Sequence, residues 1–126
     1  MVESINPKPE PGYDCDAVIT NSRRLLESVL VGFPPGAKAP VPGGVQAELR
    51  RIFEQLDKIL KDQGVDRTAV ASARLYLQRV NEDIAAANVV YKEFFGSHRP
   101  SRRAYGVDLQ VGMSIEAAFV VELPDS

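Results

Sequence analysis

The sequence predicts an α+β fold, in which a β-sheet carries two α-helices on one of its faces. Three observations lead to this prediction. Two segments have apolar residues at helical spacing, and five shorter segments are apolar or alternate with a period of two. Their order along the chain is strand, strand, helix, strand, helix, strand, strand (ββαβαββ). Two amphipathic helices need one face of a sheet to cover their apolar sides.

A chain of 126 residues is expected to form one domain with its own core. Residues 1–12 are rich in proline and polar groups, so we expect an extended N-terminal arm there and a single domain over 13–126. The net charge of -2 gives no general attraction to nucleic acid or to an anionic membrane. One cysteine excludes an internal disulfide, and the N-terminus lacks the apolar core of a signal peptide. We therefore expect a cytoplasmic protein without a membrane partner.

The first half of the chain is expected to form two strands, a loop and a helix. Strands over residues 17–20 and 25–31 flank a hairpin turn at 21–23. Prolines exclude regular structure from 32–44. The helix that follows ends before Gly64. Its apolar side is formed by Val45, Leu49, Ile52, Phe53, Leu56, Ile59 and Leu60, and its polar side by Glu48, Arg50, Arg51, Glu54, Asp57 and Lys58.

A third strand and a second helix come next. Residues 70–80 are expected to form the strand, with alternate residues on its two faces. Asn81 is the predicted N-cap of the helix, because Glu82 and Asp83 then lie in the first turn, where acidic groups are favourable. Gly96 ends the helix. The buried stripe consists of Ile84, Ala87, Tyr91, Phe94 and Phe95.

Residues 97–123 are interpreted as two strands joined by a polar bend at 108–110. On the second strand, one face is uniformly apolar and is predicted to be core; it consists of Met113, Ile115, Ala117, Phe119 and Val121. Glu116 lies on the other face, in the middle of a strongly apolar strand, where an unpaired buried charge is costly. We therefore expect Glu116 to have a partner or to line a wet cleft.

Two arginines precede this strand. Arg102 and Arg103 are adjacent and must point to opposite faces, so one of them can face the same cleft as Glu116. An arginine fork matches a carboxylate, and a nearby glutamate can orient a water or handle a proton. The same residues also fit a structural salt bridge. The sheet face that the helices leave uncovered needs a partner, and a symmetric homo-oligomer is its simplest source.

Other chemistries find little support in the sequence. With one histidine and one cysteine, no metal site is expected. Residues 42–44 precede a helix but lack the glycine pattern and the lysine of a phosphate loop. The basic residues around Arg102 are isolated in an acidic chain, so no nucleic-acid partner is expected. His98 fits a loop residue better than a base, and Cys15 lies far from it, which argues against a nucleophile.

Several short motifs carry a further signal. They are Asp16–Ile19 with Asn21, Gln46 with Leu56–Leu60, the Asn-x-x-Tyr-x-x-Phe-Phe run at 88–95, Pro100–Arg102 and Ile115–Ala117. In this order and at this spacing they resemble the Rid family of reactive intermediate deaminases, also called the YjgF family. The resemblance runs from about Cys15 to Leu123, which is nearly the whole chain.

The resemblance implies a chorismate-mutase-like fold with a mixed sheet, and a homotrimer with clefts between subunits. It implies that Arg102, rather than Arg103, grips the carboxylate of a 2-imino or 2-enamino acid, helped by the backbone of Ala104. It also implies that Glu116 is the catalytic residue that positions the attacking water. Ammonia then leaves and a 2-oxo acid results. No cofactor is expected, because an imine is already electrophilic.

The N-terminal part of the resemblance is less regular. Tyr13 is the candidate for the aromatic residue that the family places in the cleft and would bind substrate there. It lies one residue out of register, so Asp14 or Cys15 can hold that place instead. The loop at 36–44 also differs in length from the common pattern.

The residues Glu27-Ser28-Val29 depart most clearly from the family, which has a small residue and then Gly-Gln lining the cleft. A carboxylate of Glu27 in the cleft would compete with an anionic substrate for Arg102. Two hypotheses follow. The protein is a deaminase of 2-imino or 2-enamino acids, including a specialised aminomuconate-like substrate, or it is a non-catalytic trimer that binds a small carboxylate metabolite or a partner protein. If Glu27 pairs with Arg102, the non-catalytic hypothesis is favoured. If Glu27 faces elsewhere, the deaminase hypothesis is favoured.

Overall fold

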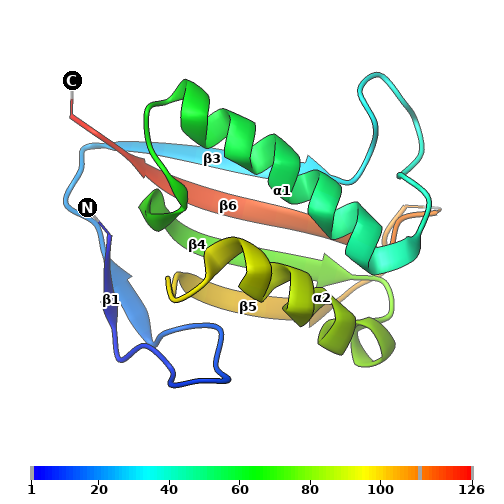
Figure 1. Ribbon diagram of the computed structural model, residues 1–126, viewed down its shortest axis with the longest axis horizontal. Coiled ribbons are helices and arrows are strands. Elements are labelled where there is room, and N and C mark those ends of the chain that lie inside the picture. The colour runs from blue at the N-terminus through cyan, green and yellow to red at the C-terminus, as the bar shows by residue number, and fades with distance from the viewer. Residues whose placement is uncertain (1, 111, 126) are drawn as a thin grey trace.

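The computed structural model describes residues 2–110 and 112–125, and it confirms the predicted α+β class (Figure 1). In the part of the chain that the structure describes, neither helix combines the length and apolar character that crossing a bilayer requires. The elements are β1 Glu3–Ile5, β2 Ala17–Ile19, β3 Arg24–Val31, α1 Gly44–Asp62, the 3-10 turn η1 Arg67–Ala69, β4 Val70–Leu77, α2 Val80–Phe95, β5 Ser101–Gly106 and β6 Ile115–Leu123.

The main sheet has four strands in the order β3-β6-β4-β5. The strand β6 pairs antiparallel with β3 on one side and with β4 on the other, whereas β5 pairs parallel with β4. A parallel pair needs a crossover connection, which α2 provides. In Figure 1, α1 lies over β3 and β6 while α2 lies over β4 and β5, so both helices cover the same face. The predicted mixed sheet with two helices on one face is confirmed.

The core lies between this face and the helices. The predicted apolar face of β6 is buried, with each side chain at most 6% exposed: Met113, Ile115, Ala117, Phe119 and Val121. Fully burying a large apolar side chain stabilises the fold by about 2 kcal/mol. Burial alternates from Ile115 to Val121 because only every second residue there meets the helices.

The helix α1 follows the prediction with two exceptions. Its apolar stripe is buried apart from Ile59, which is half-buried. Gly64 follows the helix with φ of 72°, a left-handed conformation that glycine adopts readily, so the predicted end is confirmed. Glu48, expected on the polar side, is only 2% exposed. It is buried because its Oε1 accepts a hydrogen bond from the backbone N–H of Ser114 at 2.9 Å.

The boundary between β4 and α2 differs from the prediction. The strand ends at Leu77, where its pairing with β6 stops, and the helix begins at Val80. Arg79 is the N-cap residue, and its side chain makes no capping hydrogen bond. The prediction of Asn81 as N-cap is therefore wrong. Gly96 follows the last helical residue, as predicted.

The N-terminal residues differ from the predicted extended arm over 1–12. The strand β1 lies within that segment and pairs antiparallel with β2 in a separate two-stranded sheet. Because β2 pairs with β1 and not with β3, the predicted hairpin turn at 21–23 is wrong. These residues instead connect the two sheets, and the backbone N–H of Asn21 donates to Oε2 of Glu122 at 2.6 Å.

Arg99 fixes the N-terminal segment beside the start of β5. Its side chain is 7% exposed. Its Nη1 donates to the carbonyl of Gly96 at 2.9 Å, its Nε donates to the carbonyl of Lys8 at 3.3 Å, and its Nη2 pairs with Glu10. The hydroxyl of Ser4 donates to the carbonyl of Arg99 at 2.6 Å. These contacts hold the chain that follows β1 next to β5.

The second face of the main sheet carries no helix. Leu25 and Val29 of β3 and Tyr105 of β5 are 54%, 65% and 44% exposed there. The strand register places all three on the same face as Glu116. We call this surface the open face. Exposed apolar side chains grouped in this way are typical of a protein interface.

Candidate active site

Arg102 is the centre of the candidate site, and the sheet directs it to the helix-covered face. It lies in β5 opposite Ala73 of β4. Ala73 in turn lies opposite Phe119, which belongs to the core face of β6. Because paired residues share a face, Arg102 points toward the helices. Arg103 points to the open face and is exposed.

The guanidinium of Arg102 is held by α2 and by the segment before β2. Its Nη2 donates to Oδ1 of Asn88 at 2.6 Å. The guanidinium carbon lies 4.6 Å from the ring centroid of Tyr91 and 5.2 Å from that of Tyr13. The two tyrosine rings meet edge to face, with centroids 6.4 Å apart. Contacts of this kind orient an arginine without neutralising its charge.

The electrostatics of this cluster favour an anionic ligand. Burial lowers the pKa of the Arg102 guanidinium, and the nearby Tyr91, Asp14 and Tyr13 partly offset this effect. Burial also raises the pKa of the Tyr91 phenol, which therefore stays neutral. The Nε of Arg102 and the Oη of Tyr91 are buried and have no hydrogen-bond partner among the described residues. A carboxylate that accepted from this Nε would recover the free energy that the unpaired donor costs.

A cavity of about 210 Å³ opens beside Arg102 and is lined by Asp14, Ile84, Arg102, Arg103 and Ala104. Ala104 lies two residues after Arg102, on the same face of β5. Its small side chain leaves room for a ligand. Because β5 is an edge strand, one row of its backbone groups is not used by the sheet. The cavity is smaller than the pockets of about 300–1,000 Å³ that hold drug-sized molecules, so it suits a small acid.

Glu116 lies on the other side of the sheet from Arg102. It is half-buried on the open face, opposite Val31 of β3 and Tyr76 of β4. A single chain therefore does not bring Arg102 and Glu116 into one cleft. The arginine that shares the face of Glu116 is Arg103, because the side chains alternate along β5.

Glu27 also lies on the open face. It is exposed and lies opposite Val120 of β6. Within one chain, the sheet separates its carboxylate from Arg102, so the two do not pair. Glu27 shares the open face with Glu116.

His98 and Cys15 have structural contacts. The Nε2 of His98 lies 2.7 Å from the carbonyl oxygen of Val70. Cys15 is 7% exposed, its thiol donates to the carbonyl of Ala17 at 3.1 Å, and burial raises its pKa, which disfavours the thiolate. Across residues 2–110 and 112–125, no three His, Cys, Asp or Glu side chains are grouped so that they could hold a metal ion.

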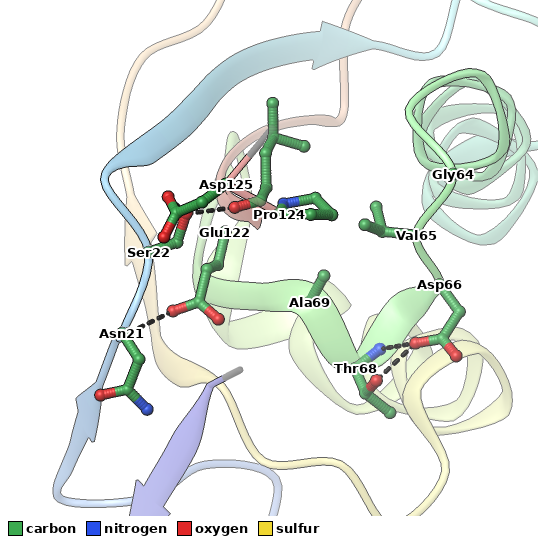
Figure 2. Close-up of a pocket in the computed structure, with 11 residues that line it drawn as sticks. Asn21, Ser22, Gly64, Val65, Asp66, Thr68, Ala69, Glu122, Pro124 and Asp125 are labelled. Atoms are coloured by element: carbon green, nitrogen blue, oxygen red, sulfur yellow. Dashed lines mark hydrogen bonds between the residues drawn. The ribbon is translucent and has the colours of Figure 1, made fainter.

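A larger cavity of about 580 Å³ lies where α1 and β6 end (Figure 2). Polar groups in its wall bond to one another. The N–H of Asn21 donates to Glu122, and the N–H of Thr68 donates to Oδ1 of Asp66 at 2.9 Å. None of the site residues predicted from the sequence is among the described residues that line it. We therefore place the candidate site at Arg102.

The structure adds residues that sequence reasoning did not assign to the site. Asn88 was part of a family motif, and its spacing of three from Tyr91 predicts that both lie on one side of a helix. That spacing is the signal that could have identified it. The sequence named Asp14 only as an alternative to Tyr13 at the N-terminal position of the cleft, and it did not assign Ile84 to the site. The two residues line one cavity because the N-terminal segment packs against α2.

Comparison with known sequences points to one family. The sequence matches the family described as Endoribonuclease L-PSP over residues 6–123. It is 39% identical to a 2-iminobutanoate/2-iminopropanoate deaminase of Capra hircus over 85 residues, which are 68% of this chain and 61% of that protein. This chain thus spans about three fifths of that relative. It is 36% identical to the protein of the same name from Rattus norvegicus over 104 residues, which are 81% of this chain and 75% of the relative.

Solved structures have the same fold. The YyfB protein of the Rid family from Yersinia pestis superposes with a TM-score of 0.77 at 21% identity, covering 97% of this chain and 98% of that one. A putative endoribonuclease from Thermotoga maritima gives a TM-score of 0.72 at 23% identity, covering 99% and 98%. At this identity the likeness concerns the fold alone.

Proposed function

The chain belongs to the endoribonuclease L-PSP family, which is the Rid (YjgF) family, and from this premise we propose that it hydrolyses 2-imino acids to 2-oxo acids and ammonia. The observation that carries the proposal is the partly buried guanidinium of Arg102, whose Nε has no acceptor among the described residues and which borders a small cavity. The relatives' names support 2-iminobutanoate and 2-iminopropanoate as first substrates. An aminomuconate-like acid is the specialised alternative.

In the proposed reaction, Arg102 binds the substrate carboxylate through the N–H donors that Asn88 does not occupy. The backbone of Ala104, on the edge strand, holds the substrate beside it. Water adds to the imine carbon, which is already electrophilic, so the step requires no cofactor. The C–N bond then breaks, nitrogen leaves as ammonia, and the oxygen of the water becomes the 2-oxo group.

We further propose that Glu116 directs the attacking water and that it comes from a neighbouring copy. The sheet separates Arg102 from the Glu116 of its own chain, so a complete site needs the open face of a second molecule. A homotrimer with clefts between subunits supplies it. The exposed Leu25 and Val29 support such an assembly, because a neighbour would remove them from water. The proposal predicts a particle of three times the chain mass of 13.8 kDa in light scattering.

The activity is tested with imines generated in situ by an amino-acid oxidase, following their loss with a trapping reagent. We expect the purified protein to accelerate hydrolysis of 2-iminobutanoate or 2-iminopropanoate, and Arg102→Ala to lose that acceleration while remaining folded. If the folded wild-type protein gives no acceleration over buffer with these imines or with an aminomuconate-like acid, the deaminase proposal is wrong. A non-catalytic carboxylate-binding protein would then explain the Arg102 cavity.

The shared site is tested by mixing two inactive variants. Arg102→Ala and Glu116→Gln are each expected to be inactive when assembled alone. In randomly mixed oligomers, about one quarter of the sites would combine an intact Arg102 from one copy with an intact Glu116 from the next. Co-expression should therefore restore about a quarter of wild-type activity. If oligomers that contain both variants recover no activity, the proposal that Arg102 and Glu116 of one site come from different copies is wrong.

The proposed cellular setting follows the sequence. We propose a cytoplasmic location, which the single cysteine, buried at position 15, supports because disulfide-free chains suit a reducing compartment. The proposed partners are a small carboxylate substrate and further copies of the chain, with no nucleic acid. Fractionation of the producing cells checks the location.

A further inference from the structure

The cavity beside Arg102 contains an acidic residue that carboxylate binding does not explain. Asp14 lines it together with Arg102 and Ala104. A carboxylate at this position weakens the binding of a simple anion, because like charges repel at short range. Arg102 alone would therefore make a better site for a simple anion than the pair does.

The structure holds Asp14 at the cavity through the residues on either side of it. Its backbone carbonyl accepts a hydrogen bond from the N–H of Lys8 at 2.8 Å. Tyr13, which precedes it, lies against the Arg102 guanidinium, and Cys15, which follows it, is buried. Because both neighbours are fixed, the backbone of Asp14 is held where this residue lines the cavity.

Asp14 does not occupy the place of a ligand carboxylate. The Nε of Arg102 has no hydrogen-bond partner in the part of the chain that the structure describes, so Asp14 leaves that donor open. The cavity therefore presents two groups of opposite charge, one from β5 and one from the segment before β2. Ile84 adds an apolar wall from α2 that suits a short alkyl side chain.

We propose that Asp14 makes this cavity selective for zwitterionic acids, in which a positively charged nitrogen sits on the carbon next to the carboxylate. The inference rests on the proposed function and names its specificity residue. A protonated 2-imino acid has both charges, so Arg102 binds its carboxylate while Asp14 accepts from the iminium N–H. The 2-oxo acid has lost the nitrogen and keeps only the negative charge. Asp14 thus favours the substrate over the product and promotes product release.

The test compares two stable ligands by isothermal titration calorimetry. L-2-Aminobutanoate carries both charges, and 2-oxobutanoate carries only the carboxylate. In the wild-type protein we expect L-2-aminobutanoate to bind about fivefold more tightly than 2-oxobutanoate, because one partly exposed charge contact contributes only a small free energy of binding. Asp14→Asn, which keeps the shape of the side chain, should remove that preference by weakening the amino acid and strengthening the oxo acid. Asp108→Asn, an exposed residue of the loop after β5, makes the same charge change and should keep the preference.

The outcomes separate this inference from the proposed function. If Arg102→Ala abolishes binding of both ligands but Asp14→Asn keeps the wild-type ratio, Asp14 has no role in specificity and the proposed function is unaffected. If Arg102→Ala binds both ligands as the wild type does, the Arg102 site itself is wrong. A wild-type protein that binds neither ligand at millimolar concentration would overturn both. Loss of the preference in Asp14→Asn alone supports the inference.

Discussion

Replacing Arg102 by lysine tests the proposed role of its guanidinium more sharply than removing the side chain. Lysine keeps the positive charge but presents a point charge on a flexible stem in place of a planar fork. The fork is what the structure has fixed, through Asn88 on Nη2 and the ring of Tyr91 on its face. If the site needs only a cation, Arg102→Lys should keep nearly wild-type activity. If it needs two-point binding of a carboxylate, the variant should lose activity.

The expected loss follows from the hydrogen bonds involved. The Nε of Arg102 lacks an acceptor among the described residues, so a ligand carboxylate can take it together with a second N–H. A hydrogen bond to a charged group contributes about 2 kcal/mol, so losing one of the two lowers kcat/KM by about thirtyfold. Arg102→Ala loses both bonds, about 4 kcal/mol, and should lower kcat/KM by about a thousandfold.

The assay is steady-state hydrolysis of 2-iminobutanoate, with urea unfolding of each variant to show that it remains folded. Arg50→Lys is the matched control, because Arg50 is exposed on α1 and pairs with Glu93 at 3.4 Å across the surface. It should stay within about twofold of the wild type, since exposed ion pairs contribute little. Wild-type kcat/KM in Arg102→Lys, or an equal loss in Arg50→Lys, would refute two-point binding at position 102.

Two further predictions concern stability. A Cβ at Gly32 would lie 2.6 Å from the carbonyl oxygen and 2.7 Å from the Cα of Glu48, so Gly32→Ala must push α1 away and should lower the free energy of unfolding in urea by about 3 kcal/mol. A Cβ at Gly64 meets no atom within 4 Å, so Gly64→Ala should cost only about 1 kcal/mol, for its left-handed backbone. Equal costs for the two variants would contradict this prediction. Asp66→Ala removes the N-cap of η1 and should cost about 1 kcal/mol at neutral pH. Hydrogen bonds from Thr68 lower the pKa of Asp66 in the folded protein. The stability that Asp66 contributes is therefore present above its ordinary pKa of 3.8 and is lost as the pH falls through the lowered folded pKa. The unfolding curves of the wild type and Asp66→Ala should then converge in strong acid.

The elements predicted well from the sequence are those with one long buried face. Burial alternates along most of β6 and repeats every three to four residues along α1, because in each the core imposes the period. The strand β1 has no such pattern. It spans three residues and is paired because Arg99, far along the chain, holds the segment after it. Contacts of that kind leave no trace in local sequence.

The site was predictable only in part for a related reason. Period two shows that Arg102 and Arg103 oppose each other, but the register of β5 on β4 decides which one meets the helices. The family resemblance selected Arg102 and proposed Tyr13 beside it, and the structure does bring these two together. It does not bring Glu116 to them within a chain. The alternating pattern of β6 is enough to predict that Glu116 lies on the sheet face away from the core. The face on which Arg102 lies depends instead on how β5 pairs with β4.

The position of β4 between β5 and β6 limits what one chain can do alone. Arg102 and Phe119 lie in line across β4, and Glu116 is three residues from Phe119 along its strand and on the other face. With strands about 4.8 Å apart and a rise of about 3.3 Å per residue, Arg102 and Glu116 are separated by about 14 Å along the sheet. A water that Glu116 holds must come within about 3 Å of the imine carbon. An isolated chain should therefore bind a small acid at Arg102 without converting it, and turnover should appear only when the open face of a neighbour reaches β5.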